Sequence, residues 1–166
     1  MKLKFVLFIT IVTFSYVWSF ASENNESEVL PKVTNEVYKE NCGACHFAYP
    51  PGLLLARSWM KIIDNPGGHA GGDLSIDKNT KDEIKKYLNQ NSAEKSQSNI
   101  SKRILASIGS DVPSKISKVP YIRNKHHEIK QEVFSRKSIG SRGNCIACHK
   151  TAEQGEYDDD NVTIPK

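Results

Sequence analysis

The sequence predicts a mainly α-helical protein with extensive loops and little or no β structure. Apolar residues recur at helical spacing in several segments, for example Ile84, Tyr87 and Leu88, whereas no convincing run of alternating apolar and polar residues indicates strands. Large aliphatic residues are also few for a chain of 166 residues. The polypeptide alone would therefore build only a small core, and we expect a bound group to fill part of the interior.

The first residues have the pattern of a secretory signal. Two lysines precede an apolar run over residues 5–20, which ends in the sequence Ser-Phe-Ala, typical of a signal-peptidase site. We predict that residues 1–21 are a signal peptide and that the mature chain begins at Ser22, without a membrane span. Retention of the apolar run as a membrane anchor is the alternative, because the run is long for a signal.

All four cysteines lie in two pentapeptides of the same form, CGACH at residues 42–46 and CIACH at residues 145–149. The frame Cys-x-x-Cys-His is the attachment signature of c-type haem. Each thiol adds to one haem vinyl group, and the adjacent histidine is held under the iron as an axial ligand. We therefore predict two covalently attached haems, with Cys42, Cys45, Cys145 and Cys148 as attachment residues and His46 and His149 as iron ligands.

Three other uses of these cysteines explain the sequence less well. Two disulfides would suit an exported chain but leave the histidine at the same offset in both motifs unexplained. A zinc site made of four cysteines needs two Cys-x-x-Cys pairs much closer in sequence than the pairs at residues 42–45 and 145–148. A thioredoxin-like pair needs a βαβ pattern, whereas the residues before Cys42 read as helix. Because haem of this kind is attached outside the bacterial cytoplasmic membrane, we expect a periplasmic protein.

The ligands on the far side of each iron must come from the remaining histidines, because methionine is nearly absent. Once Met1 is removed with the signal, only Met60 remains, and it lies on an ordinary apolar helix face. At least one haem must therefore use histidine or keep an open position. The remaining histidines are His69, His126 and His127.

His69 lies in the glycine-rich stretch NPGGHAGGD, residues 65–73. Free backbone torsions and the lack of neighbouring side chains would let this loop curl over a flat macrocycle and present an imidazole to iron. We predict His69 as the far-side ligand of the first haem. The alternative is a solvent-exposed loop histidine with no such role.

His126 and His127 are distinguished by helical periodicity. If the segment YIRNKHHEIKQEVF, residues 121–134, is one helix, then Ile122, His126, Ile129 and Val133 share one apolar stripe, whereas His127 lies on the polar face. We therefore predict that His126 is the far-side ligand of the second haem and that His127 is a surface residue.

The chain divides at the polar run over residues 89–99 into an N-terminal haem lobe, residues 22–92, and a C-terminal haem lobe, residues 93–166. We expect one helix before Cys42 and a second from Leu54 to Ile63. A third helix should begin at a capping box formed by Thr80 and Glu83 and end near Asn91. A fourth should contain Ile100, Ile104 and Ile108 and end at Gly109.

Basic charge is concentrated in the second lobe. Residues 101–150 contain eleven Lys or Arg and three acids, whereas residues 153–160 contain five acids and no base. Most charge runs are solvated surface. The segment from Lys115 to Arg142 is a candidate docking face for an acidic protein partner, and nothing beyond the charge itself suggests nucleic acid.

Four stretches, CGACHFAYPPGLLLARSW, HAGGDLSID, VPYIRNKHHEI and GNCIACHKTAEQGEYDDDNVTIP, together resemble the small periplasmic dihaem cytochromes c of proteobacteria over nearly the whole mature chain. The resemblance implies bis-histidine ligation of both haems, His46 with His69 and His149 with His126. It also implies electron exchange with membrane-bound cytochrome b type proteins and small soluble haem proteins. Leu55 and Ala70 stand where the family usually has a proline and an aromatic residue.

We therefore expect an electron carrier and not an enzyme, because two irons with both axial positions filled have no place for a substrate. The alternative is a haem enzyme or gas-binding protein in which one haem has an open coordination position. An exported structural module with disulfides is a further alternative.

Overall fold

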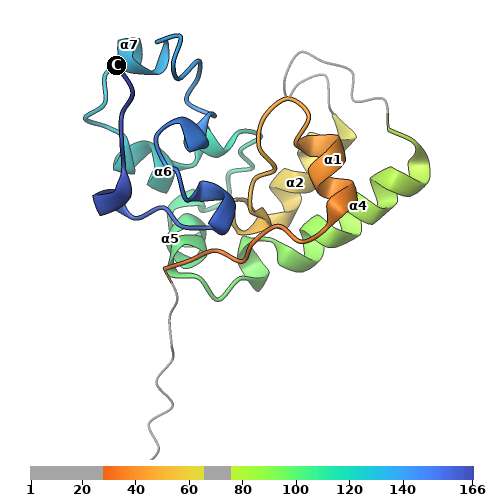
Figure 1. Cartoon of the computed structure of the whole chain (residues 1–166). Helices are drawn as coiled ribbons and strands as arrows, with labels where there is room; N and C mark the ends of the chain where they lie inside the picture. The colour runs from red at the N-terminus through yellow and green to blue at the C-terminus, as the bar shows by residue number, and fades with distance from the viewer. Residues whose placement is uncertain (1–27, 66–75) are drawn as a thin grey trace, which may run out of the picture.

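The computed structural model describes residues 28–65 and 76–166, which fold into helices joined by long connections (Figure 1). The predicted signal peptide, residues 1–21, lies outside the described residues. In the described ranges, β structure is limited to one isolated antiparallel bridge between His149 and Val162. The mainly α prediction is therefore confirmed. The α-helices are α1 (Glu36–Cys42), α2 (Ala56–Asp64), α4 (Lys78–Asn91), α5 (Asn99–Ile108), α6 (Pro120–Lys125) and α7 (Gln131–Phe134).

Helices α1, α2 and α4 lie together on one side of the molecule, and α6, α7 and the C-terminal segment lie on the other (Figure 1). Short 3₁₀ turns lie between and after the helices, at η1 (Pro51–Leu53), η2 (Ala93–Lys95), η3 (Ile116–Lys118), η4 (Cys145–Ala147), η5 (Ala152–Gln154) and η6 (Asp159–Asn161). Three predicted helix ends are confirmed, since α1 ends at Cys42, α4 at Asn91 and α5 directly before Gly109. Among the described helices, none has the length and apolar character needed to cross a bilayer.

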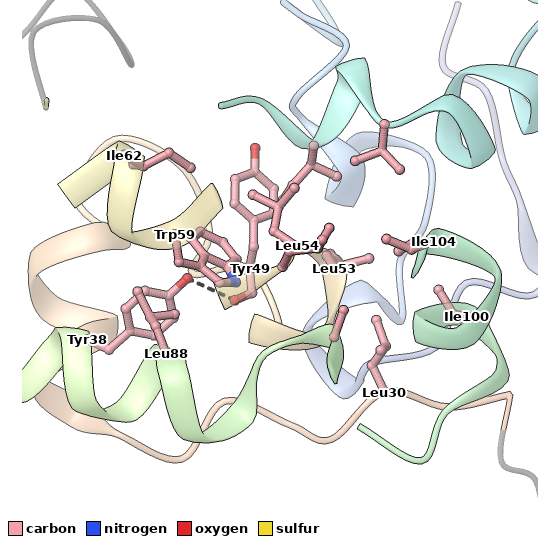
Figure 2. Packing of buried hydrophobic residues seen from close by; sticks show 14 of the residues in the cluster. Leu30, Tyr38, Tyr49, Leu53, Leu54, Trp59, Ile62, Leu88, Ile100 and Ile104 are labelled. Atoms are coloured by element: carbon pink, nitrogen blue, oxygen red, sulfur yellow. Dashed lines mark hydrogen bonds between the residues drawn. The ribbon is translucent and has the colours of Figure 1, made fainter. Parts of the chain in front are cut away.

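The larger core joins both predicted lobes (Figure 2). Tyr38, Trp59 and Leu88 from the N-terminal part and Ile100 and Ile104 from α5 belong to one buried cluster. The buried Trp59 indole in this cluster donates to the Pro51 carbonyl at 2.8 Å. A second cluster near the C-terminus contains only three buried side chains, those of Phe134, Ile139 and Ala147. The division at residues 89–99 stays a prediction.

The start of α4 differs from the predicted capping box. The Asp77 carboxylate accepts hydrogen bonds from the backbone amides of Asn79 and Thr80, and the helix begins at Lys78. The Thr80 hydroxyl itself donates to Asp77, while Glu83 accepts from the side chain of Asn35. The prediction of Thr80 as the cap was therefore wrong, because a carboxylate three residues earlier satisfies the first free amides.

The predicted single helix over residues 121–134 is also wrong, because it breaks at His126. Helix α6 ends at Lys125, and the chain turns before α7 begins at Gln131. The His126 ring nitrogen Nδ1 lies 2.7 Å from the carbonyl oxygen of Ile122. A continuing helix would use that oxygen for the backbone amide of His126, which instead donates to Arg123. The imidazole thus takes the place of the next helical hydrogen bond.

The N-terminal end of the described chain is fastened to the segment after the second motif. The backbone amide of Leu30 donates to the carbonyl of Gly155 at 2.9 Å, and Leu30 is buried. Gly155 has a left-handed φ of 84°, and a Cβ atom there would lie 2.0 Å from the Leu30 carbonyl oxygen. Only glycine meets both conditions.

Candidate functional site

The second attachment motif is a single turn that brings its reactive side chains to one cavity. Residues Cys145–Ala147 form a 3₁₀ turn, and the backbone amide of His149 donates to the Cys145 carbonyl at 2.8 Å. Cys145, Cys148 and His149 therefore all line the same cavity of about 690 Å³, here called the C-terminal cavity. Its volume falls within the usual range of ligand sites, about 300–1,000 Å³.

His126 lies opposite His149 across this cavity. Their ring centres are 6.0 Å apart, and their planes differ by 69°. Two imidazoles that bind one metal from opposite sides, each at about 2 Å, have ring centres about 6 Å apart. In the part of the chain that the structure describes, no three potential ligand side chains gather to hold a metal ion alone. Two facing imidazoles fit a metal whose remaining ligands come from a macrocycle.

The lining of the C-terminal cavity combines apolar and charged side chains. Phe134, Ile139 and Tyr157 line it, and the ring centres of His126 and Phe134 lie 6.4 Å apart. Val29 and Ile164, which are 41% and 42% exposed, also belong to the lining. A flat apolar group bound here would remove this surface from water. The residues present therefore fit a haem.

Hydrogen bonds from the histidine rings to backbone carbonyls determine which ring nitrogen is available to iron. Because Nδ1 of His126 faces the Ile122 carbonyl, it carries the proton, and Nε2 keeps its lone pair. Nδ1 of His46 likewise lies 2.8 Å from the Phe47 carbonyl oxygen. This arrangement, in which the other ring nitrogen donates to a carbonyl, is usual for metal-binding histidines.

Burial shifts the titration of the groups in the second motif. Burial and the neighbouring His126 lower the pKa of His149 below its ordinary value, while the negative charge of Asp159 opposes this shift. Burial also raises the pKa of the Cys145 thiol to about 11. Both changes favour the uncharged forms, so His149 offers a neutral imidazole at neutral pH.

His127 is not directed to this cavity. Its side chain is 67% exposed, and its nearest carboxylate is that of Glu128 at 3.8 Å. The exposed position agrees with the surface role that periodicity predicted, although the helix assumed in that prediction breaks at His126. The structure thus separates the two adjacent histidines by the turn after α6.

The first attachment motif follows the end of α1. Cys42 is the last residue of the helix and is partly buried, while Cys45 is exposed. The His46 ring packs against Tyr49, with ring centres 4.6 Å apart and planes 31° from parallel. His69, the predicted far-side ligand, lies outside the described residues. The described part of the first site therefore consists of Cys42, Cys45 and His46.

The four cysteines form no disulfide with one another in the structure. Cys42 is partly buried, and burial raises its pKa to about 11. The two motifs lie in different parts of the fold, the first after α1 and the second before η5. Each pair of thiols can therefore serve one attached group.

Two aromatic residues at these sites were missed by sequence reasoning. Tyr157 lies beside His149, with ring centres 5.5 Å apart, and Tyr49 lies beside His46. Tyr49 directly precedes two prolines, and Tyr157 lies in the acidic run over residues 153–160. No periodic signal marks either residue, because each reaches its histidine through a turn of irregular backbone.

Comparison with solved structures gives two close relatives. Diheme cytochrome c from Rhodobacter sphaeroides is 34% identical, with a TM-score of 0.66, and the match covers 76% of this chain and 99% of that one. A diheme cytochrome type c from Shewanella baltica OS155 is 33% identical, with a TM-score of 0.64 and coverage of 79% and 93%. No match is found among curated proteins.

The family comparison covers both attachment motifs. The family model for dihaem cytochrome c matches residues 38–157, from the middle of α1 to the turn beyond His149. This range contains all four cysteines and both histidines of the Cys-x-x-Cys-His frames. Together with the two solved relatives, it shows that this chain belongs to the dihaem cytochrome c family and carries two c-type haems with their iron.

Proposed function

We propose that this dihaem cytochrome c is a periplasmic electron carrier in which each iron is held between two imidazoles, His46 with His69 and His149 with His126. The observation that carries the proposal is the 6.0 Å separation of the His126 and His149 ring centres across the C-terminal cavity. With both axial positions filled by protein, a haem supplies a one-electron couple and no open position for substrate. Outer-sphere electron transfer is the chemistry that remains.

The chain's own residues set the conditions for this chemistry. The carbonyls of Ile122 and Phe47 orient the imidazoles of His126 and His46 through their Nδ1 atoms. Apolar side chains such as Phe134 and Ile139 exclude water from the second site. Imidazole ligation without a thioether gives lower reduction potentials than His/Met ligation.

Charge at the surface supports docking of a redox partner. Basic side chains between α5 and the second motif are exposed, and they include Lys115, Lys118, Lys130, Arg136, Lys137 and Arg142. We call this set the basic face, and its positive charge favours contact with an acidic protein surface. We infer that the partners are redox proteins, namely a membrane cytochrome b type protein and a small soluble haem protein. Export through the signal at residues 1–21 would bring the carrier to both.

The test is the spectrum of the oxidised and reduced holoprotein. We expect two low-spin ferric signals in electron paramagnetic resonance and a reduced absorption spectrum that carbon monoxide leaves unchanged. Rapid binding of carbon monoxide to one haem would contradict the proposal, because it requires an exchangeable axial position. That result would favour a haem enzyme or gas-binding protein.

A further inference from the structure

Tyr49 contacts elements of both haem sites. Its ring packs against the imidazole of His46, which lies three residues earlier, with ring centres 4.6 Å apart. Its hydroxyl donates to the carbonyl of Gly143 at 2.5 Å, across 94 positions of sequence. Gly143 lies two residues before Cys145, the first attachment residue of the second motif. One side chain thus spans from an axial histidine to the other attachment loop.

The position of Tyr49 is fixed from several directions. Its backbone carbonyl accepts a hydrogen bond from the buried Tyr38 hydroxyl at 2.9 Å, and its ring extends from that bond toward the opposite part of the fold (Figure 2). The ring of Phe47 contacts it edge-on, with centres 4.6 Å apart. Pro50 follows directly and restricts the Tyr49 backbone to extended conformations. Tyr49 itself is only 8% exposed.

The hydroxyl of Tyr49 is the donor in this hydrogen bond, because a carbonyl oxygen can only accept. The Gly143 carbonyl receives this hydrogen bond in a region with little access to water, since Gly143 is itself partly buried. The same carbonyl also accepts from the backbone amide of Cys145 at 3.0 Å, so the Tyr49 hydroxyl and the first attachment residue share one acceptor. Loss of the Tyr49 bond would remove the side-chain contact that holds the loop leading into Cys145.

We propose that Tyr49 is a positioning residue that couples the two haem sites, holding the His46 imidazole with its ring and the Cys145 loop with its hydroxyl, so that electron exchange between the two irons depends on it. This inference rests on the proposed function, because it requires His46 and His149 to bind iron. In each exchange one electron would pass from the ferrous iron of one haem to the ferric iron of the other. No bond is broken and no proton moves, so the Tyr49 hydroxyl stays protonated throughout.

The contacts of Tyr49 provide a route for electron tunnelling between the two attachment motifs. Tunnelling of an electron is faster through covalent and hydrogen bonds than through empty space. From His46 the route consists of one ring contact, the bonds of the tyrosine side chain, one hydrogen bond and the backbone from Gly143 to Cys145. Two non-covalent steps therefore connect an iron ligand of the first haem to the covalent anchor of the second.

The experiment uses half-reduced holoprotein, in which exchange between haems is measured from the haem-methyl resonances in nuclear magnetic resonance. Tyr49→Phe keeps the ring contact and removes the hydrogen bond, so we expect exchange to slow several-fold while both low-spin signals stay unchanged. Tyr49→Leu removes both contacts, so we expect slower exchange together with a shifted low-spin signal from the His46 haem. Tyr87→Phe is the control, because its hydroxyl contacts the Thr34 amide away from both motifs.

The outcomes separate this inference from the proposed function. If wild-type protein shows two low-spin haems and Tyr49→Phe exchanges electrons at the wild-type rate, the role of Tyr49 is overturned while the carrier function stands. If wild-type protein itself shows a high-spin or carbon monoxide-binding haem, the proposed function falls first. Should Tyr49→Leu fail to assemble, Tyr49→Phe decides alone, since it removes one oxygen atom only.

Discussion

His126 and His149 face each other across the C-terminal cavity with ring centres 6.0 Å apart. They come from different connections, His126 from the turn that ends α6 and His149 from the turn after η4. Neither turn is a regular element, so the spacing between the rings depends on local hydrogen bonds at each end. The first of these is the contact between Nδ1 of His126 and the Ile122 carbonyl.

Replacement of His126 tests its assignment as an iron ligand. We expect His126→Ala to convert one low-spin haem to high spin, because the iron loses one of its two imidazoles. His127→Ala is the matched control and should leave both haems low-spin, since its side chain is 67% exposed. His69→Ala should convert the other haem. Electron paramagnetic resonance measures all three, and a spin change in His127→Ala would contradict the assignment.

Acid should weaken the second site. The folded protein lowers the pKa of His149 below the ordinary 6.5, so below pH 6.5 the unfolded chain binds a proton that the folded chain does not yet bind. The stability of the folded state therefore falls as the pH decreases from 6.5 toward the lower pKa that His149 has in the folded protein. Asp159→Asn removes a charge that opposes this shift, so the pKa of His149 in the folded protein falls further, the acid-induced loss of stability is larger, and the low-spin spectrum should be lost at a higher pH. Asp160→Asn is the control, and an equal shift there would refute the role of Asp159.

Haem attachment should be needed for order in the C-terminal part. The local cluster has only three buried side chains, which is too small a core to fold alone. We expect the double variant Cys145→Ala/Cys148→Ala to be cleaved by protease within residues 120–166, while α1, α2, α4 and α5 stay protected. Mass spectrometry of the fragments reports the sites. The matched variant Cys42→Ala/Cys45→Ala keeps the second haem and should keep this region protected.

The contact between Gly155 and Leu30 should be sensitive to a single methyl group. Gly155→Ala places a Cβ atom 2.0 Å from the Leu30 carbonyl oxygen and also forces a left-handed φ on alanine. Gly140→Ala has the same φ requirement, at 82°, with no atom within 4 Å. The left-handed conformation costs about 1–2 kcal/mol. In chemical denaturation, Gly140→Ala should lose about that amount and Gly155→Ala clearly more, and equal losses would contradict the clash.

Partner docking should depend on the basic face and on salt. We expect Lys118→Glu/Lys137→Glu to slow electron transfer to an acidic soluble c-type cytochrome several-fold at low ionic strength. The difference should shrink in high salt, because screening weakens attraction between exposed charges. Lys86→Glu/Lys95→Glu reverses the same number of charges at exposed positions outside the basic face and serves as the control. Stopped-flow kinetics that show no salt dependence in wild-type protein would contradict the docking face.

Much of the framework could be predicted because its signals are local. Attachment motifs have fixed spacing, and α5 follows from the apolar periodicity of Ile100, Ile104 and Ile108. The α4 cap was missed because Asp77 and Thr80 are both good caps, and only the backbone geometry selects between them. The break at His126 depends on a ring nitrogen taking the Ile122 carbonyl, which periodicity does not register.

Other parts of the sites depend on contacts between distant segments. Tyr49 meets Gly143 across 94 positions, and Leu30 meets Gly155 across almost the whole described chain. Single-sequence patterns carry no signal for such pairs, because each partner looks ordinary in its own neighbourhood. The assignment of His69 rests on its glycine-rich surroundings, the scarcity of methionine and the family resemblance, and it stays a prediction.

The pairing of Leu30 with Gly155 also sets an order of assembly. Leu30 is synthesised well before Gly155, because it lies far earlier in the sequence. The packing around Leu30 therefore cannot be completed until the segment after the second motif has been made. A truncated product that lacks the residues after His149 would have both attachment motifs, but the Leu30 segment would have no packing partner.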